Sequence, residues 1–565
     1  MKRRHFVQKA ALGSLAIHLP MWACNGTQLS PERELDAYQQ LSYDLLKTWC
    51  DAMIRDQLRD TDDPSLYGAL YCHACEKIHG RCMDAVYPFM YMASATGEQK
   101  YIDAAIDVMQ WSENVSRPDG SWTVIPNPKS WRGITVFGAI ALAEALHHHG
   151  NLLPTGLHEK WRQRLSKAAE FIHLNFTIDY SHINYAFTAV YALNLLGRMF
   201  DNTAYLEHSH ALAREIPNWL THPKLLLFGE NQPMKGKSKK GLLPVDLGYN
   251  VEETINGMVQ YAVMENDENL LQLLSQSMES HLAFMLPDGA WDNSWGTRQN
   301  KWSYWGSRTT DGCQPAFSLM AKHNPAFATA AYCNTELLQR CTVDGLLAGG
   351  LHYDDHGVKP CIHHTFAHAK SLAFVLDNKE QIGAVRKTVP LPRSTANGLQ
   401  HFPEIDVWLA ARGPWRATVS TYDAVFKKQY SQAATGGSLA VLWHDPVGPI
   451  FTASMAEYLL AEANNQQLQP DGEDIPLTPR IELTEEGSWY SNLFDLEATA
   501  VASDDGTQIQ FDIKTQLTNR EGVVSLAGVF TLTYRLSANE IQISATRPIS
   551  QNATTASLVL PIISP

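Results

Sequence analysis

Apolar residues recur every three or four positions along much of the chain, between about residues 31 and 378. In residues 35–53 this spacing is typical of an amphipathic α-helix that turns one face toward a core. The same pattern predicts helices at 101–111, 133–147, 161–174, 185–199, 251–262, 270–284 and 315–320. Loops rich in Gly, Pro, Asp and Trp separate these segments, so the pattern predicts a domain built from repeated helices.

Two of the loops resemble each other. Residues 117–122 and 286–291 both carry Pro-Asp-Gly followed closely by Trp, directly after a predicted helix. Pro-Asp-Gly favours a turn, because Pro fixes φ, Asp bonds to its own backbone and Gly accepts positive φ. A helix followed by this turn and a Trp is typical of helical-hairpin toroids. This inference rests on analogy with such toroids and not on a strict sequence repeat.

The pattern changes after about Asn378. Residues 417–422, 438–443 and 449–454 are short stretches rich in β-branched and aromatic side chains, and 508–514, 523–536 and 540–545 alternate apolar with polar residues. These features predict an antiparallel sheet or sandwich. The predicted fold is therefore multidomain, α then β: an (α/α) toroid at 24–385 and an antiparallel β domain at 386–565, with the boundary between Asp377 and Arg393.

The N-terminus predicts export. Basic residues within 1–9 precede a largely apolar run at 10–20, which is a signal-peptide pattern too short to span a bilayer. Arg3-Arg4 resembles a twin-arginine signal, and Ala23-Cys24 resembles a lipobox that would end the signal at residue 23 and lipidate Cys24. An ordinary cleaved signal is the alternative. We expect a periplasmic or outer-membrane protein whose contact with the membrane is only through a lipid anchor.

Composition narrows the choice of partner. The 565 residues carry a net charge of −14, which argues against nucleic acid, because nucleic-acid binding requires a basic face. The 15 Trp and 21 Tyr suit carbohydrate stacking, although large helical domains also bury many aromatic rings.

An exported helical toroid followed by a β domain resembles the (α/α)-toroid polysaccharide lyases, which include alginate, heparin and chondroitin lyases. It is also similar to lyases that act on rhamnose–glucuronate linkages of ulvan and plant gums. The resemblance implies β-elimination of an acidic poly- or oligosaccharide to give an unsaturated uronate. It implies no required cofactor, and leaves room for a structural or charge-neutralising divalent metal. In that superfamily an Asn, a His, a Tyr and often an Arg carry the chemistry.

Elimination has defined chemical requirements. The proton at C5 of a uronate is only weakly acidic, so its carboxylate must be neutralised by Asn, Arg, a protonated His or a metal ion. A Tyr or His then removes the proton, and another protonates the leaving oxygen.

Two segments that open helices carry such residues. His182, Asn184 and Tyr185 resemble the Asn-bearing segments of these lyases, so we predict catalytic roles for them, with Asn184 as a simple N-cap the alternative. In the second segment Tyr249 is a further catalytic candidate. Asn250 is a predicted substrate contact or, with Glu253, a capping box.

Residues 292–308 hold three Trp, one Tyr, two Arg and one Lys, which is typical of a sugar-binding loop. Trp stacks on sugar rings and Arg clamps carboxylates, although a packed loop with Arg–aromatic stacking is the alternative. The predicted substrate contacts in this loop are Trp295, Arg298, Lys301, Tyr304, Trp305 and Arg308.

Three histidines follow one another closely at His363, His364 and His368. The last two share a face if the segment is helical. They suit a proton relay, a carboxylate site or metal ligands, and core histidines are the alternative. We predict catalytic roles for His363 and His364, and substrate contact for His368.

Cys72, Cys75 and Cys82 have zinc-like ligand types but match no standard finger spacing, so a metal, a disulfide and buried thiols all remain open. His79 and Arg81, in the same segment, are predicted to face a uronate. The other cysteines are predicted to be scattered core residues: Cys50, Cys313, Cys333, Cys341 and Cys361.

Three other functions compete with the lyase. A glycoside hydrolase would need two facing carboxylates, for which the loops offer Asp246, Glu252, Asp288 and Asp292. A dehydratase acting on uronate oligosaccharides would share the lyase chemistry. A glycan-binding lipoprotein would need no clustered histidines. We favour the lyase because His, Tyr, Arg and Asn dominate the loops.

Overall fold

The structure is a computed structural model that describes residues 35–59, 61–302, 304–306, 311–426, 433–452, 455–457, 476–547 and 555–561. The predicted signal peptide, Cys24 and Arg308 lie outside these residues. Within them, no helix combines the length and the apolar character needed to cross a membrane.

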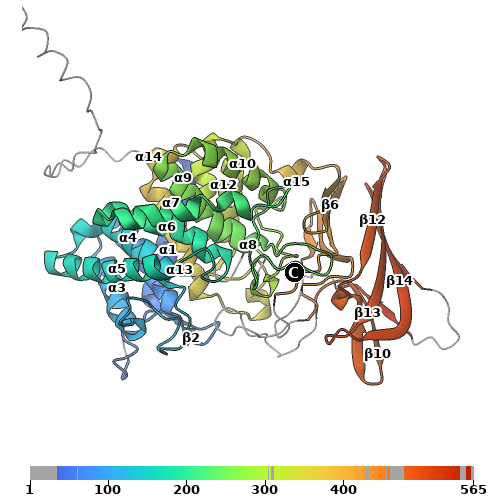
Figure 1. Ribbon diagram of the computed structural model, residues 1–565, viewed down its shortest axis with the longest axis horizontal. Coiled ribbons are helices and arrows are strands. Elements are labelled where there is room, and N and C mark those ends of the chain that lie inside the picture. The colour runs from blue at the N-terminus through green and yellow to red at the C-terminus, as the bar shows by residue number, and fades with distance from the viewer. Residues whose placement is uncertain are drawn as a thin grey trace, which may run out of the picture. The chain divides into compact units, whose positions relative to one another are not determined.

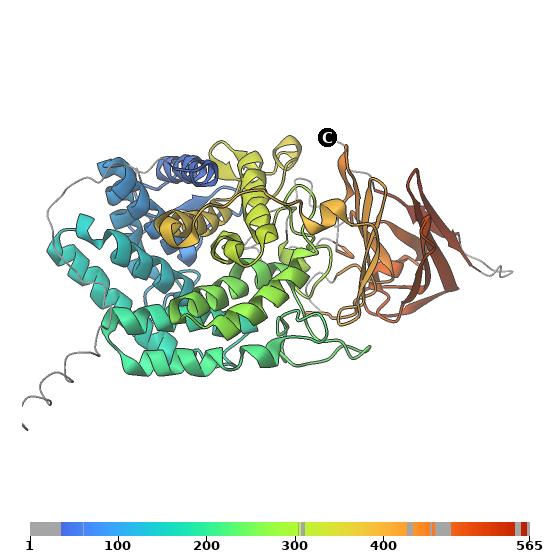
Figure 2. The same cartoon turned by 90° about the horizontal axis from the view of Figure 1, so that it is seen from above.

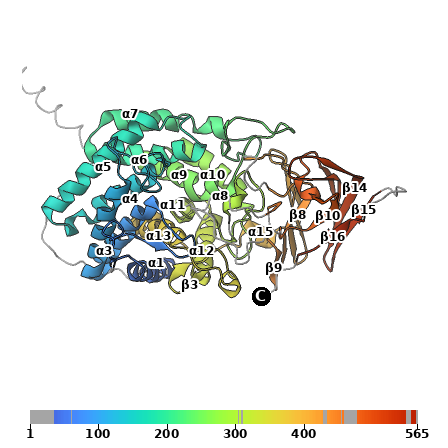
Figure 3. The ribbon, with the colours of Figure 1, turned by 90° about the horizontal axis from the view of Figure 1, so that it is seen from below.

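Six helices of the described chain form a closed inner ring, because each packs against the next and the last packs back on the first. They are α2 (Val86–Thr96), α4 (Thr135–His149), α6 (Ile183–Phe200), α9 (Ile255–Glu265), α11 (Gln314–Leu319) and α13 (Ile362–Asp377). Figure 3 shows α4, α6, α9, α11 and α13 toward the middle of the helical part.

A second helix covers each inner helix from outside: α3 lies on α2, α5 on α4, α7 on α6, α10 on α9, α12 on α11 and α1 on α13. These helices are α1 (Ala37–Arg55), α3 (Gln99–Trp111), α5 (Thr155–Asn175), α7 (Thr203–Ala213), α10 (Glu268–Leu282) and α12 (Pro325–Arg340). Sequence explains the two layers: α4 is buried almost all round, whereas α5 buries only one stripe. The predicted helical toroid is confirmed (Figures 1 and 2).

Short elements connect the helices. They include the hairpins β1 (Tyr71–Cys72) with β2 (Lys77–Ile78) and β3 (Thr342–Val343) with β4 (Leu346–Leu347). The 3₁₀ helix η1 (Gly80–Ala85) precedes α2, and α8 (Leu247–Tyr249) leads through a π-helical turn, Asn250–Thr254, into α9. The helical part ends with α14 (Lys379–Ile382) and α15 (Pro392–Thr395), so the predicted boundary at 385/386 lies between these two helices.

The C-terminal residues form two antiparallel sheets, which confirms the second half of the predicted fold. The first sheet runs β5 (Gly398–Phe402), β6 (Val407–Arg412), β7 (Trp415–Ser420), β8 (Ser438–His444) and β9 (Gly448–Phe451). The second runs in the order β15 (Ile541–Thr546), β14 (Val524–Ser537), β13 (Gln508–Thr518), β11 (Ser488–Ser491), β10 (Arg480–Glu485) and β16 (Ser557–Val559), with β12 (Thr499–Asp504) also paired to β13.

The two sheets share one apolar core. Alternate residues of β13, Ile509, Phe511 and Ile513, point into it and join a cluster that includes Trp408 and Val419 from the first sheet. This alternation is the reason that the segment forms a strand with one face buried.

Buried polar contacts join the toroid to the first sheet. Arg393 of α15 donates to Asp292 of a toroid loop at 2.6 Å and to Thr418 of β7 at 2.5 Å, and Thr418 also contacts Asp292. Nearby, the Tyr422 hydroxyl accepts from the Val245 N–H at 2.7 Å. Both members of the Arg393–Asp292 ion pair are buried.

Replacing Arg393 by Met should lower the free energy of unfolding by about 3–5 kcal/mol, because Asp292 would remain as a buried charge without its cation. Denaturant unfolding measures the change. The control is Lys387→Met, which breaks an exposed pair with Glu336 and should cost less than about 1 kcal/mol. Equal losses in the two variants would contradict a structural role for the buried pair.

Candidate active site

Asn184 and Tyr185 lie in the first turn of inner helix α6. The N-cap is His182, so the alternative in which Asn184 caps the helix is wrong. The Asn184 backbone N–H donates to Glu230 Oε1 at 3.0 Å, and its side-chain Nδ2 donates to Glu253 Oε2 at 2.6 Å. The Asn184 amide is therefore fixed by two carboxylates from other parts of the chain.

Tyr249 and Asn250 lie where α8 passes into the π-helical turn. Asp246 is the N-cap of α8 and accepts from the Tyr249 N–H at 3.3 Å, so the predicted capping box at Asn250 is wrong: the helix begins earlier. Asn250 is fully buried and donates to the Leu227 carbonyl at 2.9 Å, and its predicted substrate contact stays a prediction. The π-helical turn places both Glu252 and Glu253 in the interior, and such turns are frequent at functional sites.

Two cations surround the Tyr249 side chain. Lys301 Nζ donates to the Tyr249 hydroxyl at 3.2 Å, and the Arg298 guanidinium lies 4.1 Å from the ring centroid. Arg298 also donates to Glu230 Oε2 at 3.0 Å, and Glu230 accepts from the Asn184 N–H as well. Glu230 thus links Asn184 to the loop that carries both cations.

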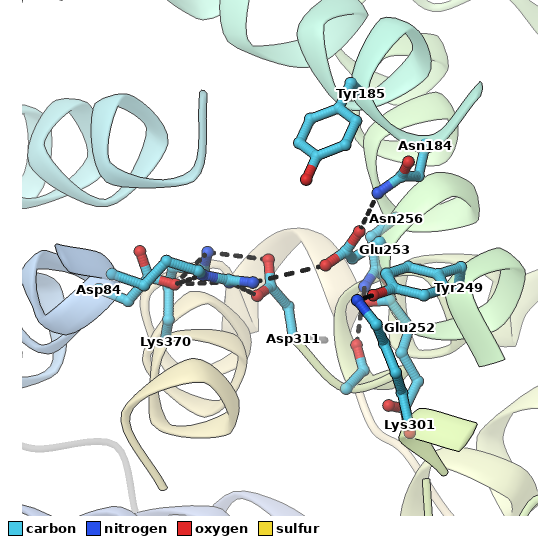
Figure 4. A network of polar contacts seen from close by, with 12 residues as sticks. Asp84, Asn184, Tyr185, Tyr249, Glu252, Glu253, Asn256, Lys301, Asp311 and Lys370 are labelled. Atoms are coloured by element: carbon cyan, nitrogen blue, oxygen red, sulfur yellow. Dashed lines mark hydrogen bonds and ion pairs between the residues drawn. The ribbon is translucent and has the colours of Figure 1, made fainter. Parts of the chain in front are cut away.

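Glu253 joins this group to a buried ion network (Figure 4). Arg81 of η1 lies 3.4 Å from Glu253 Oε1 and 2.6 Å from Asp84 Oδ2, and also contacts Asp311. Lys370 of α13 lies 2.8 Å from Asp311 and 3.4 Å from Asp84. Arg81 is therefore held by carboxylates of the protein, and its predicted contact with a uronate stays a prediction.

The protein surroundings raise the pKa values of two residues in this group, Glu253 and Tyr185. Burial and the Asp311 carboxylate raise the pKa of Glu253 to about 8, against the opposing effects of Arg81 and Asn184. Burial, with Tyr249 and Glu253 nearby, raises the pKa of Tyr185 well above its usual range. Figure 4 shows Tyr185 next to Asn184, with its hydroxyl on the side of the ring away from the Asn184 amide.

The three histidines of α13 lie in two different environments. His364 and His368 lie on one face of α13 against Trp305, with ring centroids 5.3 and 4.4 Å from it. Both are fully buried, and burial lowers the pKa of His368 to about 4. His363 turns instead to His79, whose ring centroid is 5.0 Å away.

His79 Nδ1 accepts from the Arg81 N–H at 3.0 Å and so caps η1. The His182 ring lies 5.3 Å from that of Phe426. The predicted catalytic and substrate-binding roles of these two histidines and of those on α13 stay predictions.

Most aromatic residues of the 292–308 loop pack inward. Trp295 is fully buried against Phe284 and Tyr422, and Trp305 is fully buried and donates to the Ala348 carbonyl at 2.6 Å. Both rings pack against other parts of the chain, and their predicted substrate contacts stay predictions. The half-buried Tyr304 donates to Asp288.

Trp131 was not singled out from the sequence, although it stands in a loop with Pro and Asn, where an aromatic residue is a useful signal. It is 43% exposed, and its Nε1 donates to the Tyr185 hydroxyl at 2.9 Å. Asp311 and Lys370 were missed as well, because isolated charged residues carry no signal in the sequence.

The carboxylates considered for a hydrolase have structural contacts instead. Asp246 caps α8 and accepts from the Arg298 N–H at 2.7 Å, Asp288 bonds to Tyr304 and Asp292 pairs with Arg393. Glu252 lies 3.8 Å from His368. None of these contacts sets two carboxylates across an open site.

The Glu253→Gln variant tests the raised pKa. Because Glu253 titrates near 8 instead of the ordinary 4.5, its contribution to stability is complete below about pH 4.5 and is lost as pH rises through about 8. Gln keeps an uncharged acceptor for Asn184. We expect the variant to gain stability relative to the wild type by at least about 1 kcal/mol between about pH 5 and pH 9 in denaturant unfolding.

The exposed Glu336→Gln is the control, and should change stability by less than about 1 kcal/mol at either pH. A Glu253→Gln curve parallel to that of the wild type across this range would contradict the raised pKa.

Comparisons with known proteins show the family to which the chain belongs. The model of the ulvan lyase N-terminal domain matches residues 46–394, and that of the ulvan lyase C-terminal domain matches residues 399–565. A broad-specificity ulvan lyase of Formosa agariphila is 50% identical over 572 aligned residues, which cover 100% of this chain and 89% of that protein.

Among solved structures, a glycosyl hydrolase family 88 protein of Bacteroides vulgatus has 13% identity, covers 59% of this chain and 99% of its own, and has a TM-score of 0.41. A second solved structure, that of a polysaccharide lyase, is 12% identical to this chain. The match covers 60% of this chain and 98% of that protein, with a TM-score of 0.40. On the strength of the two family models and the full-length relative, the chain belongs to the ulvan lyase family and is a polysaccharide lyase.

Proposed function

We propose that this protein cleaves ulvan by β-elimination at its uronate residues, with the cluster of Asn184, Tyr185, Tyr249, Arg298 and Lys301 as the active site. The full-length relative named as an ulvan lyase supports the substrate. The mechanism rests on one observation: an amide, two tyrosines and two cations come together from separate parts of the inner ring and its loops.

Asn184, oriented by Glu253, binds the substrate carboxylate. With a pKa of about 8, Glu253 is mostly protonated at neutral pH and can donate its proton to an amide oxygen. Asn184 Oδ1 is buried without a hydrogen-bond partner. If the amide turns over, protonated Glu253 donates to Oδ1 and Nδ2 becomes available to donate to a uronate carboxylate.

The two tyrosines take opposite parts of the proton transfer. Lys301 donates to the Tyr249 hydroxyl, and a cation at this distance stabilises a tyrosinate, so Tyr249 is the base. Burial and its neighbours raise the pKa of Tyr185, so Tyr185 retains its proton and is the acid. The two hydroxyls thus have different neighbours, a lysine at Tyr249 and an indole N–H at Tyr185, and one site can provide both an acid and a base when two similar groups have different surroundings.

The reaction balances without water. Tyr249 removes the proton from C5, the electron pair forms a double bond between C4 and C5, and the bond from C4 to the linking oxygen breaks. Tyr185 gives its proton to that oxygen. The products are a new chain end and an unsaturated uronate, and exchange with solvent restores both tyrosines.

The test is incubation of the protein with ulvan while ultraviolet absorbance of an unsaturated uronate is followed. We expect absorbance to rise with the wild type, and Tyr249→Phe and Tyr185→Phe each to lower the rate by about 10²–10⁴-fold, as expected for the loss of a general base or acid. Tyr205→Phe is the matched control: this hydroxyl bonds to Glu170 between outer helices, and its loss should change the rate less than twofold.

Shorter products without absorbance would overturn the elimination mechanism. Full activity in both Phe variants would leave elimination standing but overturn the assignment of the tyrosines.

A further inference from the structure

Four metal-ligating side chains from distant parts of the chain meet at one point. They are Cys72, Cys75, Cys361 and His363, and one ligand atom of each lies within 4.8 Å of those of the other three. All four side chains are buried. Cys361 was predicted to be a scattered core cysteine, and Cys82 a member of the cluster; the structure reverses these two predictions.

The spacing of the sulfurs matches a metal site rather than a disulfide. Cys361 Sγ lies 3.6 Å from Cys72 Sγ and 3.8 Å from Cys75 Sγ. A disulfide requires about 2.05 Å. Ligands about 2.3 Å from a tetrahedral zinc ion place their sulfurs about 3.8 Å apart, which is the separation observed.

The local backbone positions the four ligands as two pairs, one on the β1–β2 hairpin and one at the start of α13. Cys72 ends β1 and Cys75 lies in the turn before β2, so the hairpin directs both sulfurs to the same side. The Cys75 N–H points to Cys72 Sγ at 3.4 Å, a contact that orients a thiolate and stabilises its charge. Cys361 is the N-cap of α13 and His363 stands in the first turn.

We propose that Cys72, Cys75, Cys361 and His363 bind a structural zinc ion. Three thiolates and one imidazole form a closed tetrahedral set of the type that zinc prefers in structural sites. The ion would fasten the β1–β2 hairpin to the start of α13, which are 289 residues apart at Cys72 and Cys361.

This site lies beside the ion network without being part of it. The hairpin continues into η1, which carries Arg81, and α13 carries Lys370; both cations contact Asp311. A metal that fixes the hairpin to α13 would therefore keep Arg81 and Lys370 at a fixed distance from each other. The zinc ion would stabilise the fold, whichever polysaccharide the protein cleaves.

The first test is the metal content of the full chain, purified without chelator, by elemental mass spectrometry. We expect about one zinc per chain in the wild type, and at least a fivefold lower content in Cys361→Ser. Cys82→Ser is the matched control, since Cys82 is an equally buried cysteine close by on η1 and outside the four ligands. It should keep the zinc.

A second measurement uses only the wild type, in case Cys361→Ser does not fold. X-ray absorption at the zinc edge should show a first shell of three sulfurs and one nitrogen, and a chelator should lower the melting temperature. The proposal is overturned if the wild type purified without chelator and incubated with zinc holds no metal, if the first shell of its zinc contains no sulfur, or if Cys361→Ser holds as much zinc as Cys82→Ser.

Discussion

The buried ion network around Arg81 links most of the elements that build the site. Arg81 comes from η1, Lys370 from α13, Asp311 from the segment before α11, and Glu253 from the turn that opens α9. Charges inside a protein are tolerated only when they are paired, so this network holds its elements in one arrangement. Asn184 bonds to Glu253 and thereby takes its orientation from the network.

A protein with a net charge of −14 can still offer positive charge to an anionic polymer at one place. Carboxylates of the protein already pair Arg81 and Lys370, so these two cations serve the scaffold. The positive charge nearest to Tyr249 comes from Lys301 and Arg298 on the opposite loop. A protonated Glu253 removes one negative charge next to the amide that would meet the substrate, so the local charge at the site differs from that of the whole molecule.

The sequence predicted the helical toroid and the β domain, because both depend on local patterns of apolar residues. It singled out the Asn184-Tyr185 segment by its residue types, and the role of that segment stays a proposal. It did not predict what depends on distant contacts. Cys361 was separated from Cys72 and Cys75 by most of the toroid, and Asp311 and Lys370 were isolated charges with no local motif. Burial could not be predicted from the sequence either: Trp295, a predicted sugar contact, is buried, whereas Trp131, which the sequence did not single out, is 43% exposed.

The central claim is that Asn184 receives the uronate carboxylate while Tyr249 and Tyr185 move the protons. The most direct measurement is a crystal structure of the Tyr185→Phe protein with an ulvan oligosaccharide bound. The account predicts the uronate carboxylate within hydrogen-bonding distance of the Asn184 amide, and the C5 hydrogen directed toward the Tyr249 hydroxyl. A uronate bound away from Asn184, or a C5 hydrogen that faces a histidine instead of Tyr249, would contradict it.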